Sequence, residues 1–176
     1  TQPSGGGPMQ LWDIDRDVPV GEESARIVPL GSGVVARFTE REPGPLFARY
    51  ERQWGRPTLE RVATGEEIPL RIRDLPDSVN VYPGGWAMPA FAAWPGGVVA
   101  FDPSTGEALG PIMTIPDGFT DVKSVSETPD GTRVVLNWWS TTRAVYETGV
   151  FEIATGAPIA RGLFGLAGSL ALDVAR

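Results

Sequence analysis

The sequence predicts an all-β protein made of repeated four-stranded antiparallel sheets, and three observations support this. The 22 glycines and 17 prolines are spread along the 176 residues instead of gathering in one tract, which favours many short strands over long helices. Between these breakers lie short runs that are solidly apolar or alternate with polar residues, as in buried and half-buried strands. A phrase made of an apolar strand, a Thr-Gly turn and a second short strand recurs along the chain.

The Thr-Gly phrase occurs three times, and its glycines are Gly65, Gly106 and Gly156. Glycine supplies the positive φ that a tight turn requires, and the threonine before it can hydrogen-bond nearby backbone groups. The glycines are 41 and 50 residues apart, a spacing that fits a β-propeller blade with loop insertions. Each copy is therefore interpreted as the outer two strands of one blade.

The inner two strands of each blade are expected just before each copy. The best-preserved pair is 122–127 and 132–139, around a turn at 128–131 that contains Asp130 and Gly131. The other two pairs are 26–30 with 34–39, and 78–82 with 86–94. The chain should thus hold about three complete four-stranded antiparallel blades and parts of a fourth.

The whole chain is divided accordingly. We expect a linker or expression remnant at 1–9, the outer strands of a partial blade at 10–25, blades at 26–75, 76–118 and 119–165, and the first strand of a next blade at 166–176. Apolar residues with helical spacing at 45–55 predict a short helix or long loop inserted in the first of these blades. Because the two ends supply only parts of a blade, we expect a segment of a larger propeller, completed by further sequence or by a second copy.

The composition excludes several kinds of chemistry. The chain has no cysteine and no histidine, so it can form neither a disulfide, a thiolate metal site nor a histidine-based catalytic arrangement. The net charge of −7 argues against direct contact with nucleic acid, and no segment approaches the ~18 apolar residues that span a membrane. We therefore expect no enzyme, cofactor or metal. We also expect a cytoplasmic location, although the absence of cysteine does not itself identify the compartment.

The acidic residues are better explained as turn residues than as ligands or catalysts. Asp13, Asp15 and Asp17 alternate as calcium ligands do, but Val18 and Ser24 stand where a calcium loop needs glycine and glutamate. Asp102 and Asp130 lie in predicted turns, whereas carboxylate catalysis needs two carboxylates facing one cleft.

The tryptophans provide the candidate core and binding residues. Trp138 and Trp139 are adjacent on one predicted strand, so they must point to opposite faces, and we expect each in a core between blades. Trp54 lies in the inserted segment and is the candidate exposed anchor for a protein or small effector. The candidate partner-binding residues on this segment are Arg49, Tyr50, Arg52 and Trp54.

Two features resemble known propeller families. Trp12-Asp13 closes a strand and residues 128–135 read Thr-Pro-Asp-Gly-Thr-Arg-Val-Val, so the chain resembles the WD-repeat propellers over nearly everything after Met9, although their Gly-His pair is absent. The phrases FDPSTGEALGP (101–111) and FEIATGAPIARG (151–162) resemble the degenerate propellers of actinobacterial transcriptional regulators. That resemblance implies a non-enzymatic binding module of a larger regulatory protein, in which other domains contact DNA.

Two alternatives stay open. The run VVAFDPSTGEAL (98–109) resembles the repeats of quinone-dependent dehydrogenase propellers, which implies a fragment whose chemistry comes from an outside cofactor. Those repeats usually end in tryptophan shortly after the glycine, where this chain has Leu70, Leu109 and Ala160. The other alternative is a purely architectural scaffold that holds neighbouring domains apart and binds nothing.

Overall fold

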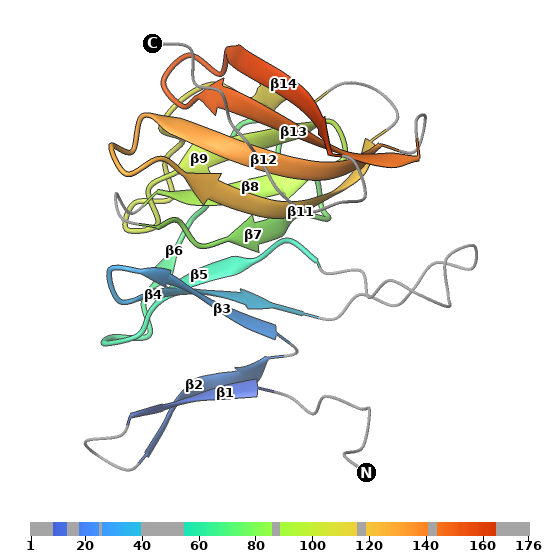
Figure 1. The fold of residues 1–176 in the computed structure, drawn as a ribbon. Helices are drawn as coiled ribbons and strands as arrows, with labels where there is room; N and C mark the ends of the chain where they lie inside the picture. The colour runs from blue at the N-terminus through green and yellow to red at the C-terminus, as the bar shows by residue number, and fades with distance from the viewer. Residues whose placement is uncertain are drawn as a thin grey trace.

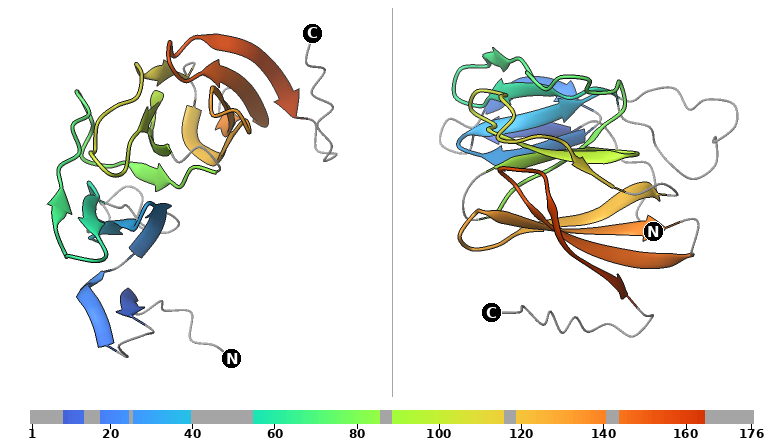
Figure 2. Two further views of the ribbon diagram at one scale, coloured as in Figure 1. Left: turned by 90° about the vertical axis from the view of Figure 1, so that its left-hand side faces the viewer. Right: turned by 90° about the horizontal axis from the view of Figure 1, so that it is seen from above.

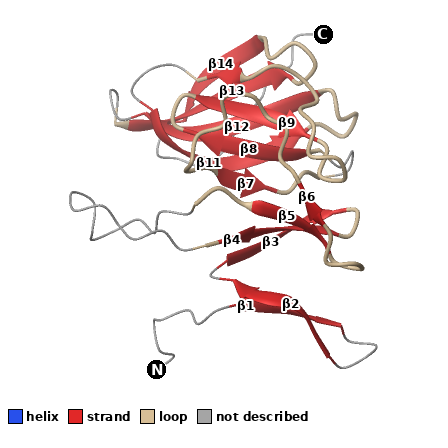
Figure 3. Cartoon of the chain, turned by 180° about the vertical axis from the view of Figure 1, so that it is seen from behind, coloured by secondary structure: helices blue, strands red, loops and turns tan. Residues whose placement is uncertain are grey.

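The computed structural model describes residues 9–13, 18–24, 26–39, 55–85, 89–115, 119–140 and 144–164. These residues form strands and turns without any helix (Figures 1 and 3), so this part of the chain has no helix that could cross a membrane. The predicted insertion at 45–55 lies outside the described residues except for Gly55.

The strands form one hairpin and three four-stranded sheets. The hairpin joins β1 (Met9–Asp13) to β2 (Val18–Ser24), so that β1 begins at the last residue of the expected linker. The first sheet contains β3 (Arg26–Gly31), β4 (Val34–Phe38), β5 (Thr58–Arg61) and β6 (Glu67–Ile68). The second contains β7 (Asn80–Tyr82), β8 (Ala90–Trp94), β9 (Gly97–Phe101) and β10 (Met113–Thr114). The third contains β11 (Phe119–Glu127), β12 (Arg133–Ser140), β13 (Val145–Glu152) and β14 (Pro158–Phe164).

Each four-stranded sheet is an antiparallel meander in which consecutive strands are neighbours. The all-β class and the three four-stranded antiparallel sheets predicted from the repeats are therefore confirmed. The sheets follow one another in chain order (Figure 1), and the left view of Figure 2 shows this series bending along an arc.

Two apolar cores lie between the three sheets, because the strands of the middle sheet are apolar on both faces. On β8, Ala90 and Ala92 belong to the core shared with the first sheet, whereas Phe91 and Ala93 belong to the core shared with the third. On β9, Phe101 faces the first of these cores. Strands buried on both sides are solidly apolar instead of alternating, which explains the unbroken apolar runs of β8 and β9.

The three Thr-Gly turns have the same geometry. Their glycines have φ values of +70°, +72° and +67°, and each glycine N–H donates to the carbonyl four residues earlier at 2.8, 2.7 and 2.8 Å. In each turn, the threonine hydroxyl accepts a hydrogen bond from the backbone N–H two residues later at 3.3 Å. The repeat seen in the sequence is thus a repeat of structure, and it provides equivalent positions in the three sheets.

Two of these turns contact the sheet before them. Arg71, just after β6, donates its backbone N–H to the carbonyl of Gly106 at 2.8 Å, and its side chain forms an ion pair with Glu107 at 3.2 Å. A Cβ on Gly106 would lie 2.1 Å from the carbonyl oxygen of Pro69, and one on Gly156 would lie 3.1 Å from the Pro111 ring. A Cβ on Gly65 would meet no described atom within 4 Å. Among the described residues, the turns that contact a preceding sheet are therefore the two that follow a four-stranded sheet.

Candidate binding site between the second and third sheets

The surface predicted from the sequence as partner-binding falls outside the described residues. Arg49, Tyr50, Arg52 and Trp54 all lie in the segment 40–54. The structure instead contains a cavity whose lining includes none of these four residues.

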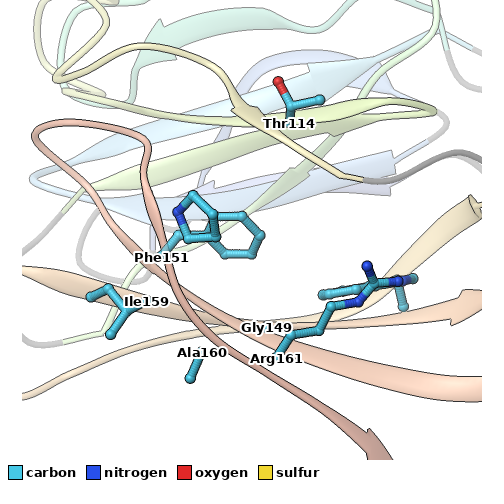
Figure 4. Close-up of a pocket in the computed structure, with 8 residues that line it drawn as sticks. Thr114, Gly149, Phe151, Ile159, Ala160 and Arg161 are labelled. Carbon is cyan, nitrogen blue, oxygen red and sulfur yellow. The ribbon is translucent and has the colours of Figure 1, made fainter.

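This cavity, of about 370 Å³, opens between β10 and β14 near the outer edges of the second and third sheets (Figure 4). Its volume is within the range of small-ligand pockets. The lining is mostly apolar and comes largely from the third sheet: Thr114, Trp138, Gly149, Phe151, Pro158, Ile159, Ala160 and Arg161.

The two outer strands beside the cavity differ in length and in what they contribute to it. β10 has two residues, of which Thr114 lines the cavity, whereas β14 has seven, of which Pro158, Ile159, Ala160 and Arg161 line it. Ile159 is 49% exposed although it is a large aliphatic residue. Exposed apolar surface beside a cavity is typical of a binding site.

Gly149 shapes the floor of the cavity. It is paired with Leu136 on β12 and with Arg161 on β14. A Cβ at this position would lie 2.7 Å from the Phe151 ring and 2.9 Å from the Trp138 ring, which is closer than real Cβ contacts. The absent side chain thus provides the space that the two aromatic rings occupy, and any larger residue would have to displace them.

One residue of the cavity lining, Arg161, forms an ion pair with Glu147. Arg161 donates its Nε to Oε2 of Glu147 at 2.8 Å, and its Nη2 contacts the same oxygen. The Glu147 side chain is 1% exposed and that of Arg161 is 44% exposed, so the charge that reaches solvent is the guanidinium. The Arg161 Cζ also lies 5.9 Å from the centroid of the Trp138 ring, which is a cation–π distance.

The adjacent tryptophans have different environments. Trp138 is 1% exposed and belongs to the core between the second and third sheets. Trp139 points to the opposite face of β12, where it is half-buried and meets the Tyr146 ring edge-on at 4.9 Å. The expectation that both rings enter an inter-sheet core therefore describes Trp138 alone, because no sheet among the described residues covers the face that carries Trp139.

The aspartates at Asp102 and Asp130 hold turns together. The Thr128 hydroxyl donates to Asp130 at 2.5 Å and the Thr132 N–H donates to it at 3.1 Å, next to Gly131 with φ +66°. These hydrogen bonds to the carboxylate, that from Thr128 first, lower the pKa of Asp130 to about 2. The Ser104 hydroxyl likewise lowers the pKa of Asp102. Both carboxylates are therefore engaged within their own turns.

No group of three metal-ligating side chains occurs in the part of the chain that the structure describes, although Asp15 and Asp17 lie outside it. The chain matches no protein-family model and no curated protein. The case for function thus depends on the geometry of the chain itself.

Sequence reasoning missed Glu147, Gly149 and Arg161. The signal available in the sequence was the alternation of Glu147 and Gly149 within a strand whose flanking residues are apolar. Identifying the site also required the register that places Arg161 opposite Gly149, which depends on the β13–β14 pairing.

Proposed function

We propose that this chain contributes blades to a β-propeller and serves as a non-enzymatic binding module of a larger, cytoplasmic regulatory protein. The proposal is supported by the repeated Thr-Gly turn, the meander of each sheet and the arc that the sheets follow (Figure 2). Propellers consist of four-stranded antiparallel blades arranged in this way.

The exposure of one face of the third sheet is evidence for a further blade. Leu59, Ala100 and Val150 each lie six residues before a turn glycine. Leu59 and Ala100 are buried against the following sheet, with 0% and 1% of their surface exposed, whereas Val150 is only half-buried. Equivalent positions in a propeller have equivalent neighbours. We therefore infer that a further sheet, from additional sequence or from a second copy, covers the Val150 face.

The cavity between β10 and β14 is the single observation that carries the binding function. It combines an apolar lining, an exposed aliphatic residue and one accessible cation, the pattern that ligand and partner sites share. The inserted segment around Trp54 is a second surface for partners, on the evidence of its aromatic and basic residues.

A capture experiment with two matched variants tests this function. Ile159 and Leu109 both lie three residues after a turn glycine and both are 49% exposed, but only Ile159 lines the cavity. The immobilised wild-type chain and the Leu109→Glu variant should retain at least one specific protein from a cell extract that the Ile159→Glu variant loses. The absence of any specific capture by the wild-type chain would contradict a binding module and favour the architectural alternative.

A further inference from the structure

The outer edge of the third sheet differs from the outer edges of the other two. β6 and β10 each have two residues, and the turn of the next sheet contacts the chain beside each of them, at 69–71 after β6 and at 110–112 before β10. β14 has seven residues, and no described strand pairs with its outer edge. Long open edges offer a row of backbone donors and acceptors to another strand, and proteins usually shorten or cover them.

We propose that β14 accepts an extended peptide of a partner protein as a fifth strand of the third sheet. This inference rests on the proposed binding function and specifies the partner of the same site. The strand from Pro158 to Arg161 forms both part of the open edge and one wall of the cavity (Figure 4). A peptide paired with β14 would therefore place alternate side chains at the mouth of the cavity, as in other cases of strand addition.

The lining of the cavity specifies an aliphatic side chain in this peptide. Phe151, Pro158 and Ile159 supply apolar walls, and Trp138 also lines the cavity. A volume of about 370 Å³ accommodates one or two leucine-sized side chains, whose burial would also cover the exposed part of Ile159.

Arg161 specifies an acidic residue opposite it. Its Nε and Nη2 are engaged by Glu147, while its side chain remains 44% exposed. Five N–H donors are available on a guanidinium, so it can bind a second carboxylate from the peptide. An opposite charge directly across two strands stabilises their pairing.

The same residue argues against a second copy of this chain as the occupant. Arg161 is the central residue of β14, so a symmetric antiparallel pairing of two β14 strands would place two arginines opposite each other. Like charges in that position destabilise the pairing. The favoured occupant is therefore a different chain that carries an acidic residue flanked, two positions away, by an aliphatic one.

The test is a selection on the full chain from a phage library that displays random seven-residue peptides. The enriched peptides should have Asp or Glu at one position and Leu, Ile, Val or Met two positions away. The strongest peptide is then synthesised with fluorescein and titrated by fluorescence polarisation. Binding should weaken about tenfold or more for Ile159→Glu and change less than about twofold for Leu109→Glu.

Further titrations keep the result decisive. Replacing the acidic residue of the peptide by lysine should weaken binding to the wild-type chain about tenfold, because this removes the charge pair. The two sets of alternate backbone amides are N-methylated in separate peptides, and methylation of the set that faces β14 should weaken binding about tenfold, because it removes the strand pairing. Failure to enrich peptides of this class, or affinity that survives N-methylation of both sets, each tested in turn, would overturn the proposal. If the wild-type chain captures proteins from extract in the Ile159-dependent way but enriches no such peptide, this inference alone fails. If it captures nothing, the proposed function fails.

Discussion

Gly149 has no side chain because two aromatic rings occupy the space that a side chain would need. We expect Gly149→Ala to lower the free energy of unfolding by about 1–3 kcal/mol, since a methyl group there overlaps the rings of Phe151 and Trp138. Gly162→Ala on the neighbouring strand is the matched control, because its Cβ would meet no described atom within 4 Å, and it should change stability by less than about 0.5 kcal/mol. Urea denaturation measures both, and equal effects would contradict the packing described for the cavity.

Asp130 should titrate well below an ordinary aspartate. Its pKa is about 2 in the folded chain, against 3.8 as the usual value, because the Thr128 hydroxyl and the Thr132 N–H donate to the carboxylate. A lowered pKa means that this carboxylate stabilises the fold above the unfolded pKa, and that the contribution is lost as pH falls from about 4 towards 2.

An NMR titration of the Asp130 carboxyl carbon measures this. The midpoint should be about 2 in the wild type and should move towards 3.8 in Thr128→Val, which removes the main donor. A midpoint near 3.8 in the wild type would show that the turn lacks these hydrogen bonds.

For single residues, the sequence predicts on which face of a strand a side chain lies but not whether a neighbouring sheet covers that face. Adjacent residues of a strand point to opposite faces, which separates Trp138 from Trp139 without any structure. Whether a face is covered depends on a neighbouring sheet, which is why the half-buried state of Trp139 was not predictable. The Glu147–Arg161 pair was not predictable either, because it depends on how β14 aligns with β13.

The Thr-Gly turn is the element that links local sequence to the stacking of sheets. Alanine in the left-handed conformation costs roughly 1–2 kcal/mol by itself, and this should be the whole effect of Gly65→Ala, whose Cβ meets nothing described. Gly106→Ala should cost about 1–3 kcal/mol more, since its Cβ would overlap the carbonyl of Pro69 in the first sheet. Thermal denaturation of the two variants gives the difference. Identical losses of stability in the two variants would mean that the second turn does not contact the first sheet.

The turns could be predicted because glycine and threonine determine their geometry locally. The lengths of the outer strands were not predicted, although Pro69 directly follows β6 and Pro111 lies two residues before β10, whereas β14 has its only proline at its first residue, Pro158. The cavity lies between β10 and β14, and locating it required the packing of the two sheets, which the sequence alone does not give.

For the whole molecule, the Val150 face predicts association. Trp139, Tyr146 and Val150 share this face, and Tyr146 is 43% exposed. Light scattering should show an average mass that rises with concentration, and Val150→Asp should reduce the rise because it places a charge on the docking face. A wild-type chain that stays monomeric at every concentration would contradict an uncovered blade face.

The central claim is that successive sheets are joined in chain order, the Thr-Gly turns of the second and third sheets each contacting the sheet before them. Disulfide cross-linking tests it directly, because the chain contains no cysteine. Arg71 and Glu107 form a bridge between the first and second sheets and are both exposed, so Arg71→Cys with Glu107→Cys places two thiols where a disulfide fits. Ala157 lies one residue after its turn glycine, as Glu107 does, but in the third sheet, so Arg71→Cys with Ala157→Cys is the control.

Mass spectrometry after mild oxidation of the dilute protein measures both intramolecular disulfides. We predict nearly complete cross-linking of positions 71 and 107 with unchanged thermal stability, and essentially none between 71 and 157. A 71–157 disulfide, or no 71–107 disulfide, would contradict the stacking of the sheets.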